Sequence, residues 1–209
     1  MNIDPKVVSK KEIYRILIST VTPRPIAWVS SMDEKNKVNL APFSFFNVVS
    51  VNPPILGFSP LLNGEAKIKD TLRNISKQGE FVVNIVSHNY AEQMNQTSAP
   101  YGADINEMEQ VKLTPAASSL ISVPSVQEAL VRYECRLHDI ISFGDQPLAG
   151  QLILGKICSV YLDDQVFHNN RIDIQKLDTI GRMEGSFYST TRDRFSIARP
   201  VSDASDTEK

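Results

Sequence analysis

The sequence predicts a mainly β protein, an antiparallel barrel decorated by a few helices. Short β-rich runs recur along the 209 residues, and turn-forming segments separate them. Helical patterns are fewer, and they do not alternate with the strands as they would in a βαβ array. No repeat or low-complexity linker divides the chain. We therefore expect a single domain over residues 1–209, with a core at about 12–195 and flexible ends at 1–10 and 202–209.

The first two runs predict a hairpin. Residues 26–31 (IAWVSS) are followed by the polar, turn-forming segment 32–37 and then by 38–40 (VNL). The next two runs, 45–51 and 55–59, flank Asn52-Pro53-Pro54, where two prolines end any ladder and impose a turn.

Three later runs complete the predicted strands. Residues 81–86 (FVVNIV) are almost continuously apolar, as in a buried strand. Residues 129–141 alternate, with Cys135 among the apolar positions and His138 among the polar ones, and 152–162 repeat that pattern. A buried structural thiol is the better interpretation of Cys135.

Three segments predict helices. Residues 69–77 (KDTLRNISK) place Leu72 and Ile75 three positions apart, with Asp70 or Thr71 able to cap the start and Gly79 beyond the end. Residues 89–95 and 125–129 carry weaker signals of the same kind.

Composition and motifs exclude several classes of function. The net charge is −2 and the pI about 5.9, which gives no electrostatic case for binding nucleic acid or an anionic membrane. No apolar run approaches the ~18 residues of a membrane span, and the polar N-terminus has no signal core, so we expect a cytoplasmic protein. The two cysteines and three histidines share no metal-ligand spacing. Dinucleotide-fold and P-loop glycine motifs are absent too.

Residues 39–47 (NLAPFSFFN) offer one candidate binding surface. Pro42 lacks an N–H and favours a break in the ladder, so we expect the chain near residues 41–44 to leave regular pairing and free its N–H groups. Ser44 and Asn47 add polar groups that need partners, and three phenylalanines add flat apolar area. The alternative is a plain buried strand with these phenylalanines in the core.

Two basic segments are candidate anion sites. Lys69-Asp70-Thr71 stands at a predicted helix start, where N–H groups and the Thr71 hydroxyl can bind a phosphate. Asp70 would repel a phosphate at close range unless it caps the helix or meets a ribityl hydroxyl or an arginine, and the segment can equally be an ordinary helix start. Arg24 lies between two prolines that keep it extended, where it can meet an anion or a surface carboxylate.

In order along the chain, these segments resemble the flavin-reductase-like family with the FMN-binding split-barrel fold. The likeness runs from about residue 15 to 188 and rests on six motifs: residues 22–31 (TPRPIAWVSS), 39–47 (NLAPFSFFN), 52–54 (NPP), 69–75 (KDTLRNI), 79–85 (GEFVVNI) and 180–188 (IGRMEGSFY). Each motif is degenerate alone, whereas six in the same order are specific.

The resemblance implies a six-stranded antiparallel Greek-key split barrel and a homodimer with FMN near the interface. It implies that 41–47 wrap the ring and ribityl chain, that 69–74 meet the phosphate, and that Arg182 and Tyr188 close the pocket. The expected cofactor-binding residues are Arg24, Ala41, Pro42, Phe43, Ser44, Asn47, Ser59, Lys69, Asp70, Thr71 and Asn74.

The resemblance also implies the reaction class. Members commonly move a hydride from NADH or NADPH to flavin, which requires no acid or base side chain. The alternative is an electron-relay flavoprotein that binds FMN without reacting with NAD(P)H. A third hypothesis is a split-barrel protein that binds a different ligand, such as pyridoxal phosphate or haem.

Overall fold

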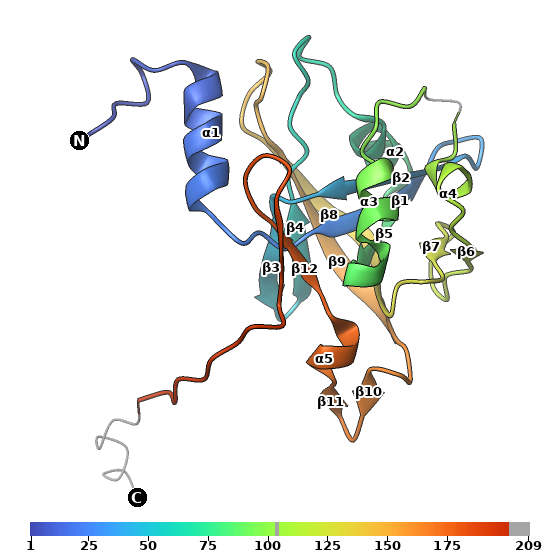
Figure 1. Ribbon diagram of the computed structural model, residues 1–209. Helices are drawn as coiled ribbons and strands as arrows, with labels where there is room; N and C mark the ends of the chain where they lie inside the picture. Colours follow the sequence, from blue (N-terminus) through green and yellow to red (C-terminus); the bar gives the residue numbers. More distant parts are fainter. Residues whose placement is uncertain (103–104, 201–209) are drawn as a thin grey trace, which may run out of the picture.

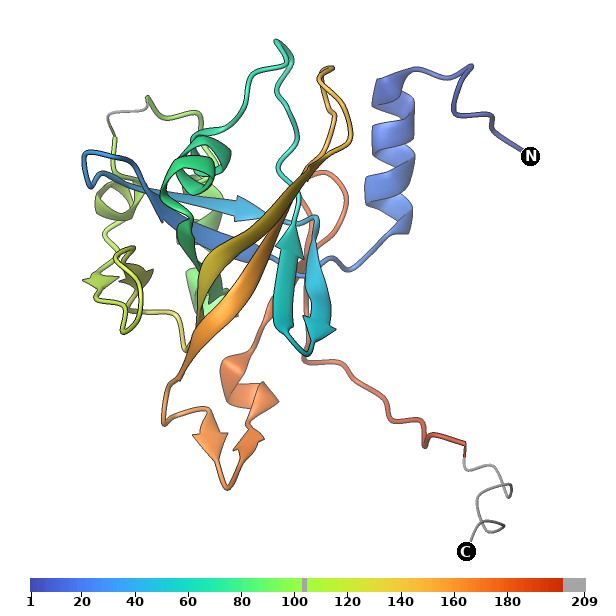
Figure 2. The ribbon, with the colours of Figure 1, turned by 180° about the vertical axis from the view of Figure 1, so that it is seen from behind.

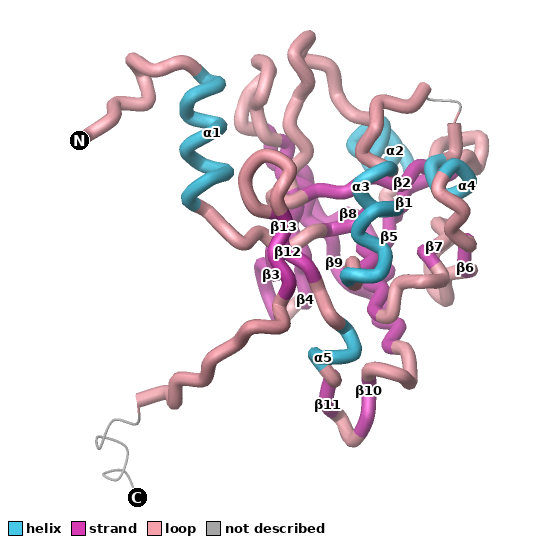
Figure 3. Tube along the Cα trace, viewed as in Figure 1, coloured by secondary structure: helices cyan, strands magenta, loops and turns pink. Residues whose placement is uncertain are grey.

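The computed structural model of the protein describes residues 1–102 and 105–200, and strands dominate it (Figures 1 and 3). Across these residues seven strands form one antiparallel sheet in the spatial order β2-β1-β5-β8-β9-β4-β3. They are β1 (Ala27–Met32), β2 (Val38–Phe43), β3 (Phe46–Val51), β4 (Pro54–Phe58), β5 (Glu80–Ile85), β8 (Val131–Ser142) and β9 (Gln151–Leu162). The prediction of a mainly antiparallel β protein is confirmed, and so are the hairpin β1–β2 and the turn between β3 and β4, which also pair with each other.

The expected count of six strands is corrected to seven in an open sheet. β2 and β3 lie at opposite edges of the sheet, yet only Ser44 and Phe45 separate them along the chain. The sheet therefore curls until its two edges meet at this junction. The interruption divides what would be one bent strand into two, and this division accounts for the additional strand.

Pro42 does not break the pairing where the sequence suggested. β2 stays paired with β1 through Pro42, which lies opposite Trp28, and through Phe43, opposite Ala27. Because β2 is an edge strand, the missing proline N–H leaves no ladder partner unsatisfied. The chain leaves regular pairing at Ser44, immediately after this strand.

Two apolar clusters hold the sheet, one on each face of β1. Ala27 and Val29 point into the barrel with Phe58 and Phe81, while Trp28 packs on the other face against Met94 from helix α3 (Ala91–Gln96). Cys135 belongs to the barrel cluster and is fully buried, so the expectation of a structural thiol is confirmed, and burial raises its pKa.

The helices lie outside the barrel (Figure 2). They are α1 (Lys10–Thr20), α2 (Asp70–Gln78), α3, α4 (Glu107–Gln110) and α5 (Ile174–Leu177), with a 3₁₀ turn at His88–Tyr90. α2 confirms the predicted helix and ends at Gly79, whose φ is 71°. Its N-cap is Lys69, so the expected caps Asp70 and Thr71 are corrected. The weak helix prediction at 125–129 is wrong, because β7 (Ser125–Val126) pairs there with β6 (Pro115–Ala116).

Two further strand pairs follow β9. They are β10 (Phe167–His168) with β11 (Arg171–Ile172), and β12 (Ile180–Arg182) with β13 (Tyr188–Thr190). An antiparallel bridge between Arg24 and Arg182 ties the β12–β13 hairpin to the segment before β1. The predicted flexible end at 202–209 lies outside the described residues, and no helix within them is long and apolar enough to cross a membrane.

Candidate functional site

A cleft of about 410 Å³ opens beside the β2–β3 junction. Its walls come from α1, the junction, the start of α2, the end of α3 and the β12–β13 hairpin. Two of these segments are tied together by the main chain: Ser59 N, after β4, donates to Phe45 O of the junction at 2.8 Å. The sheet therefore holds this side of the cleft in place. Small-molecule sites commonly have volumes of roughly 300–1,000 Å³, so the cleft has the size of a ligand site.

Six of the expected cofactor-binding residues line this cleft: Arg24, Pro42, Phe43, Ser44, Ser59 and Lys69. Segments widely separated in the sequence bring them together, because the curled sheet places the end of β2 beside the segment that follows β4 and leads to α2. The other five, Ala41, Asn47, Asp70, Thr71 and Asn74, are not part of the lining.

Two residues of α2 turn away from the cleft into the protein. The Thr71 hydroxyl accepts a hydrogen bond from Asn39 Nδ2 at 3.0 Å, and Asn74 Nδ2 donates to Ser31 Oγ at 3.3 Å. Both α2 side chains are buried. They therefore fix α2 against the sheet in this structure.

The remaining three have local partners. Asp70 forms an ion pair with Arg73, one of the alternatives that the sequence left open. Asn47 is exposed and accepts from Val48 N at 2.8 Å. Ala41 packs against the barrel cluster. The ion pair offsets the charge of Asp70 near the start of α2, which reduces its repulsion of an anion there.

Arg24 holds the cleft walls together. Its Nη1 donates to Ile18 O at 2.7 Å and to Val21 O at 2.8 Å, and its Nη2 donates to Met183 O at 2.9 Å. Its Nε lies 3.5 Å from Ser44 Oγ. Burial lowers the pKa of this guanidinium, which is only 6% exposed. The sequence offered an anion or a surface carboxylate as its partner, whereas the structure shows main-chain carbonyls.

Lys69 is the cation that remains available for a ligand. Within the described residues no carboxylate lies within 4.0 Å of its Nζ, which sits 5.4 Å from the centroid of the Phe43 ring. The side chain keeps contact with solvent, but the surrounding protein removes enough water to lower its pKa. No described side chain caps α2, so Lys69 stands beside uncapped N–H groups at a helix start.

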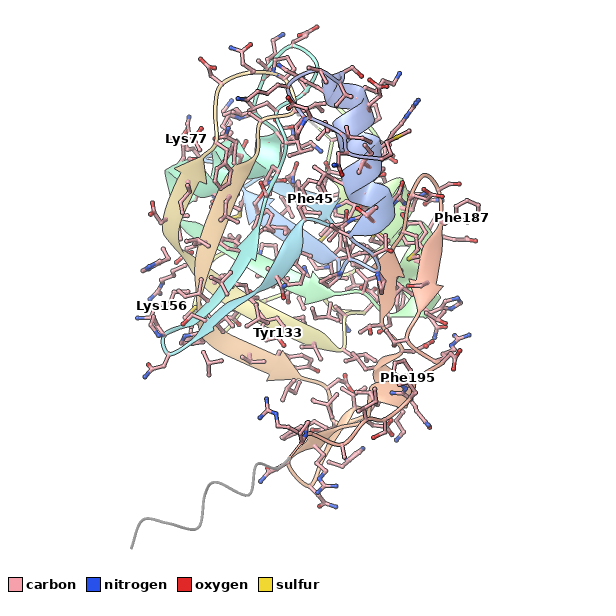
Figure 4. The ribbon with its side chains drawn as sticks, turned by 90° about the vertical axis from the view of Figure 1, so that its left-hand side faces the viewer. Phe45, Lys77, Tyr133, Lys156, Phe187 and Phe195 are labelled. Atoms are coloured by element: carbon pink, nitrogen blue, oxygen red, sulfur yellow. The ribbon has the colours of Figure 1, made fainter. Side chains whose placement is uncertain are left out.

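The opposite part of the cleft is aromatic and weakly polar. Phe45 from the junction lies close to α1 (Figure 4), and Tyr14 of α1 lines the same wall. Across the cleft the Tyr188 hydroxyl donates to Asn95 Oδ1 at 3.0 Å, and the Arg182 guanidinium lies 4.5 Å from the Tyr188 ring. The hydroxyls of Ser44 and Ser59 add donors, whereas that of Ser98 donates to Asn95 O at 2.6 Å.

Sequence reasoning missed the residues that α1 and α3 contribute. Tyr14 and Ile18 carry no motif, and only their four-residue spacing on a capped helix could have marked one face of α1. Asn95 and Ser98 follow a weak helical signal and carry no motif that marks a ligand.

Comparisons with known proteins identify relatives. The family model described as "Flavin reductase like domain" matches residues 19–176. An uncharacterized protein of Bacillus subtilis is 38% identical over 197 residues, which cover 92% of this chain and 96% of that protein. The crystal structure of nitrilotriacetate monooxygenase component B from Bacillus cereus is 35% identical with a TM-score of 0.89, covering 94% of this chain and 98% of that one. That of Pseudomonas fluorescens 2-nitrobenzoate 2-nitroreductase is 29% identical with a TM-score of 0.86, covering 96% of each.

Proposed function

Because the chain belongs to the flavin reductase like family, we propose that it is an FMN-binding oxidoreductase that takes reducing equivalents from NADH or NADPH. The observation that carries the proposal is the division of one cleft into a cationic end and an aromatic end. FMN has the matching division, with a dianionic phosphate at one end and a flat ring at the other.

Lys69 and the start of α2 fit the phosphate. A helix start offers N–H groups and a partial positive charge, and an uncapped one leaves these donors available. The Lys69 ammonium adds a full charge beside them, and a bound dianion would restore the favourable surroundings that partial burial removes. In this proposal Lys69 holds the phosphate as a point charge, and the Asp70–Arg73 pair limits repulsion.

The aromatic end fits the ring and the ribityl chain. Phe43 and Phe45 offer apolar area, and the hydroxyls of Ser44 and Ser59 can donate to ribityl or ring oxygens. When bound, the flavin supplies the two-electron redox chemistry. The residues of the chain bind and orient it, and Arg24 keeps α1, the junction and the β12–β13 hairpin at fixed spacing around it.

We also propose a homodimer with the FMN site near its interface. Helix α1 supports this, because no residue in its 11-residue length is buried although it carries three isoleucines, a leucine and a tyrosine. An isolated helix of this length is marginal in water, so its stability calls for a covering surface. The helix also lines the cleft, and a partner covering it would therefore lie beside the cofactor.

One observation favours a second candidate, an electron-relay flavoprotein. Arg24 donates to three main-chain carbonyls, and Arg182 donates to Gly185 O and lies against the Tyr188 ring, whereas Lys69 has no described hydrogen-bond partner. One such fully available cation suits the single phosphate of FMN better than the pyrophosphate of a nicotinamide dinucleotide. Reduction would then come from a redox protein.

The test is the visible spectrum of the purified protein with FMN, followed by anaerobic mixing with NADH or NADPH. Binding shifts the flavin absorbance, and bleaching of the oxidised flavin band by either nucleotide supports the reductase. An oxidised spectrum that persists under excess nucleotide but bleaches with dithionite selects the relay. A protein that leaves the FMN spectrum unchanged contradicts both candidates.

A further inference from the structure

One face of the molecule carries an extended arm that bears two large apolar side chains among charged ones. Residues 191–200, here called the arm, follow β13 and leave the body of the protein (Figures 1 and 2). Thr191 N donates to Thr179 O at 3.2 Å, and Arg192 pairs with Asp178 at 2.7 Å, so the root of the arm is fixed. Beyond the root, Phe195 and Ile197 are 89% and 81% exposed. Two large apolar side chains at this exposure call for a surface to cover them.

The same face carries an apolar groove of about 350 Å³. It runs between α1 and the β8–β9 loop, and it is here called the α1 groove. Ile13 and Leu17, one turn apart on the helix, form one wall, and Pro147 and Leu148 form the other. Tyr14, Phe45 and Leu61 line both the groove and the cleft proposed for FMN, so the two hollows adjoin.

The arm cannot fill the groove of its own chain. Seen from the side that bears both features, α1 lies at the upper end and Phe195 far below it (Figure 4). On that side the β12–β13 hairpin lies between α1 and Phe195, and the β3–β4 hairpin extends to the left, toward Lys156 (Figure 4). Groove and arm thus lie at separate places on the same side of the molecule.

A groove and an exposed arm at separate places on one side suit a second copy of the same chain. In a two-fold interface the same patch serves both partners, and whatever one copy gives it also receives. Consider a two-fold axis that lies in the plane of this face, midway between groove and arm and perpendicular to the line that joins them. Rotation about this axis places the arm of one copy opposite the groove of the other. We propose that the arm of each copy docks Phe195 and Ile197 into the α1 groove of its partner.

The docked arm would finish the wall of the flavin cleft. Because Tyr14 and Phe45 are walls of both hollows, an arm seated in the groove would cover the outer side of these residues and exclude water from the aromatic end of the site. This consequence rests on the proposed function, since it takes FMN as the occupant of the cleft. The docking itself does not depend on the cofactor.

The docking is tested by site-specific photocrosslinking. A benzophenone amino acid replaces Phe195 in the full chain, and protein grown on light and on heavy isotopes is mixed, denatured and refolded together before irradiation. We expect crosslinks from position 195 to peptides containing Ile13–Leu17 or Pro147–Leu148, with one light and one heavy partner in each mixed species. Crosslinks within one chain, to another surface, or absent altogether overturn the proposal.

A pair of variants measures the consequence for the site. Phe195→Ser combined with Ile197→Ser removes both anchors, and Leu120→Ser is the control, a 54% exposed leucine between β6 and β7. We expect the double variant to dissociate at concentrations where the control stays dimeric, and to lose FMN affinity by about tenfold or more. A double variant that remains dimeric contradicts the docking. Mapped crosslinks in a protein that binds no FMN would instead contradict the proposed function alone.

Discussion

The charge of Lys69 has opposite effects on the stability of the ligand-free protein and on the binding of a phosphate. Partial desolvation lowers its pKa below the ordinary 10.5, so the unfolded chain binds this proton more tightly than the folded protein does. Carrying the charge therefore costs the ligand-free protein stability at neutral pH, and the cost fades as the pH rises toward 10.5. A bound phosphate reverses the balance by supplying the missing negative partner.

Lys69→Met should accordingly raise the free energy of unfolding of the ligand-free protein while weakening FMN binding by about 10- to 150-fold, the range for a charged hydrogen bond. Urea denaturation and fluorescence titration measure the two effects. Thr71→Val is the matched comparison. Its hydroxyl accepts from Asn39, so FMN affinity should stay nearly unchanged, and a comparable loss there would move the phosphate contact to Thr71.

Glu107 gives a second pH-dependent prediction. Burial raises the pKa of this carboxyl above the ordinary 4.5, although the N–H of Leu40 donates to it at 2.9 Å. The folded protein keeps this proton where the unfolded chain has released it, so Glu107 makes the free energy of unfolding fall as the pH rises from 4.5 to the raised pKa. Glu107→Gln should remove this fall in urea denaturation series, whereas Glu92→Gln, at an exposed site on α3, should leave it intact. An unchanged pH profile in Glu107→Gln would contradict the prediction.

At the residue scale the sequence predicted part of the cleft. Lys69 and Ser44 were found because a basic residue at a helix start and a polar residue among phenylalanines point to ligands by local rules. The role of Arg24 was not predictable, since its partners include Met183, 159 positions away. The inward turn of Thr71 depends on Asn39 in another element, which no local pattern reveals.

At the scale of elements, the contact between β9 and the barrel core depends on a glycine. A Cβ at position 155 would lie 2.2 Å from Phe81 Cζ and 3.2 Å from Cys135 Cβ. Gly155→Ala must therefore displace a buried ring, and we expect it to lower the free energy of unfolding by about 1–3 kcal/mol or more, as overpacking does. Gly64→Ala is the control, because nothing lies within 4 Å of its added Cβ. Equal stability of the two variants in urea would contradict this account.

A local signature was enough to predict α2, which follows from its apolar spacing and the glycine after it. Helix α1 was not predicted, although its capping box of Ser9 and Glu12 is visible in the sequence. The alternating residues of β8 predicted a polar outer face. In the structure Arg132 and Glu134 on that face are buried, and the main chain at Ser119 and Leu120 donates to the Glu134 carboxylate at 2.7 Å.

At the scale of the whole molecule, FMN should stabilise the fold by mass action. With free FMN at 100 times its dissociation constant the expected gain is about 2.7 kcal/mol, which for a chain of this size raises the unfolding midpoint by about 5–10 °C. Riboflavin, which lacks the phosphate, should give a smaller shift at equal concentration. Thermal melts with each compound measure the difference. Equal shifts of the unfolding midpoint would contradict the proposal that Lys69 binds the phosphate.

The junction at Ser44 and Phe45 has a mechanical consequence. Its two edge strands meet through two residues of chain and not through a ladder, so the barrel can widen at this seam without breaking any strand pairing. Amide protons along the seam should exchange sooner than those of β5 and β8, which are paired on both sides. A molecule lodged at the seam would bridge its two sides, so opening and closing of the barrel would accompany release and capture of that molecule.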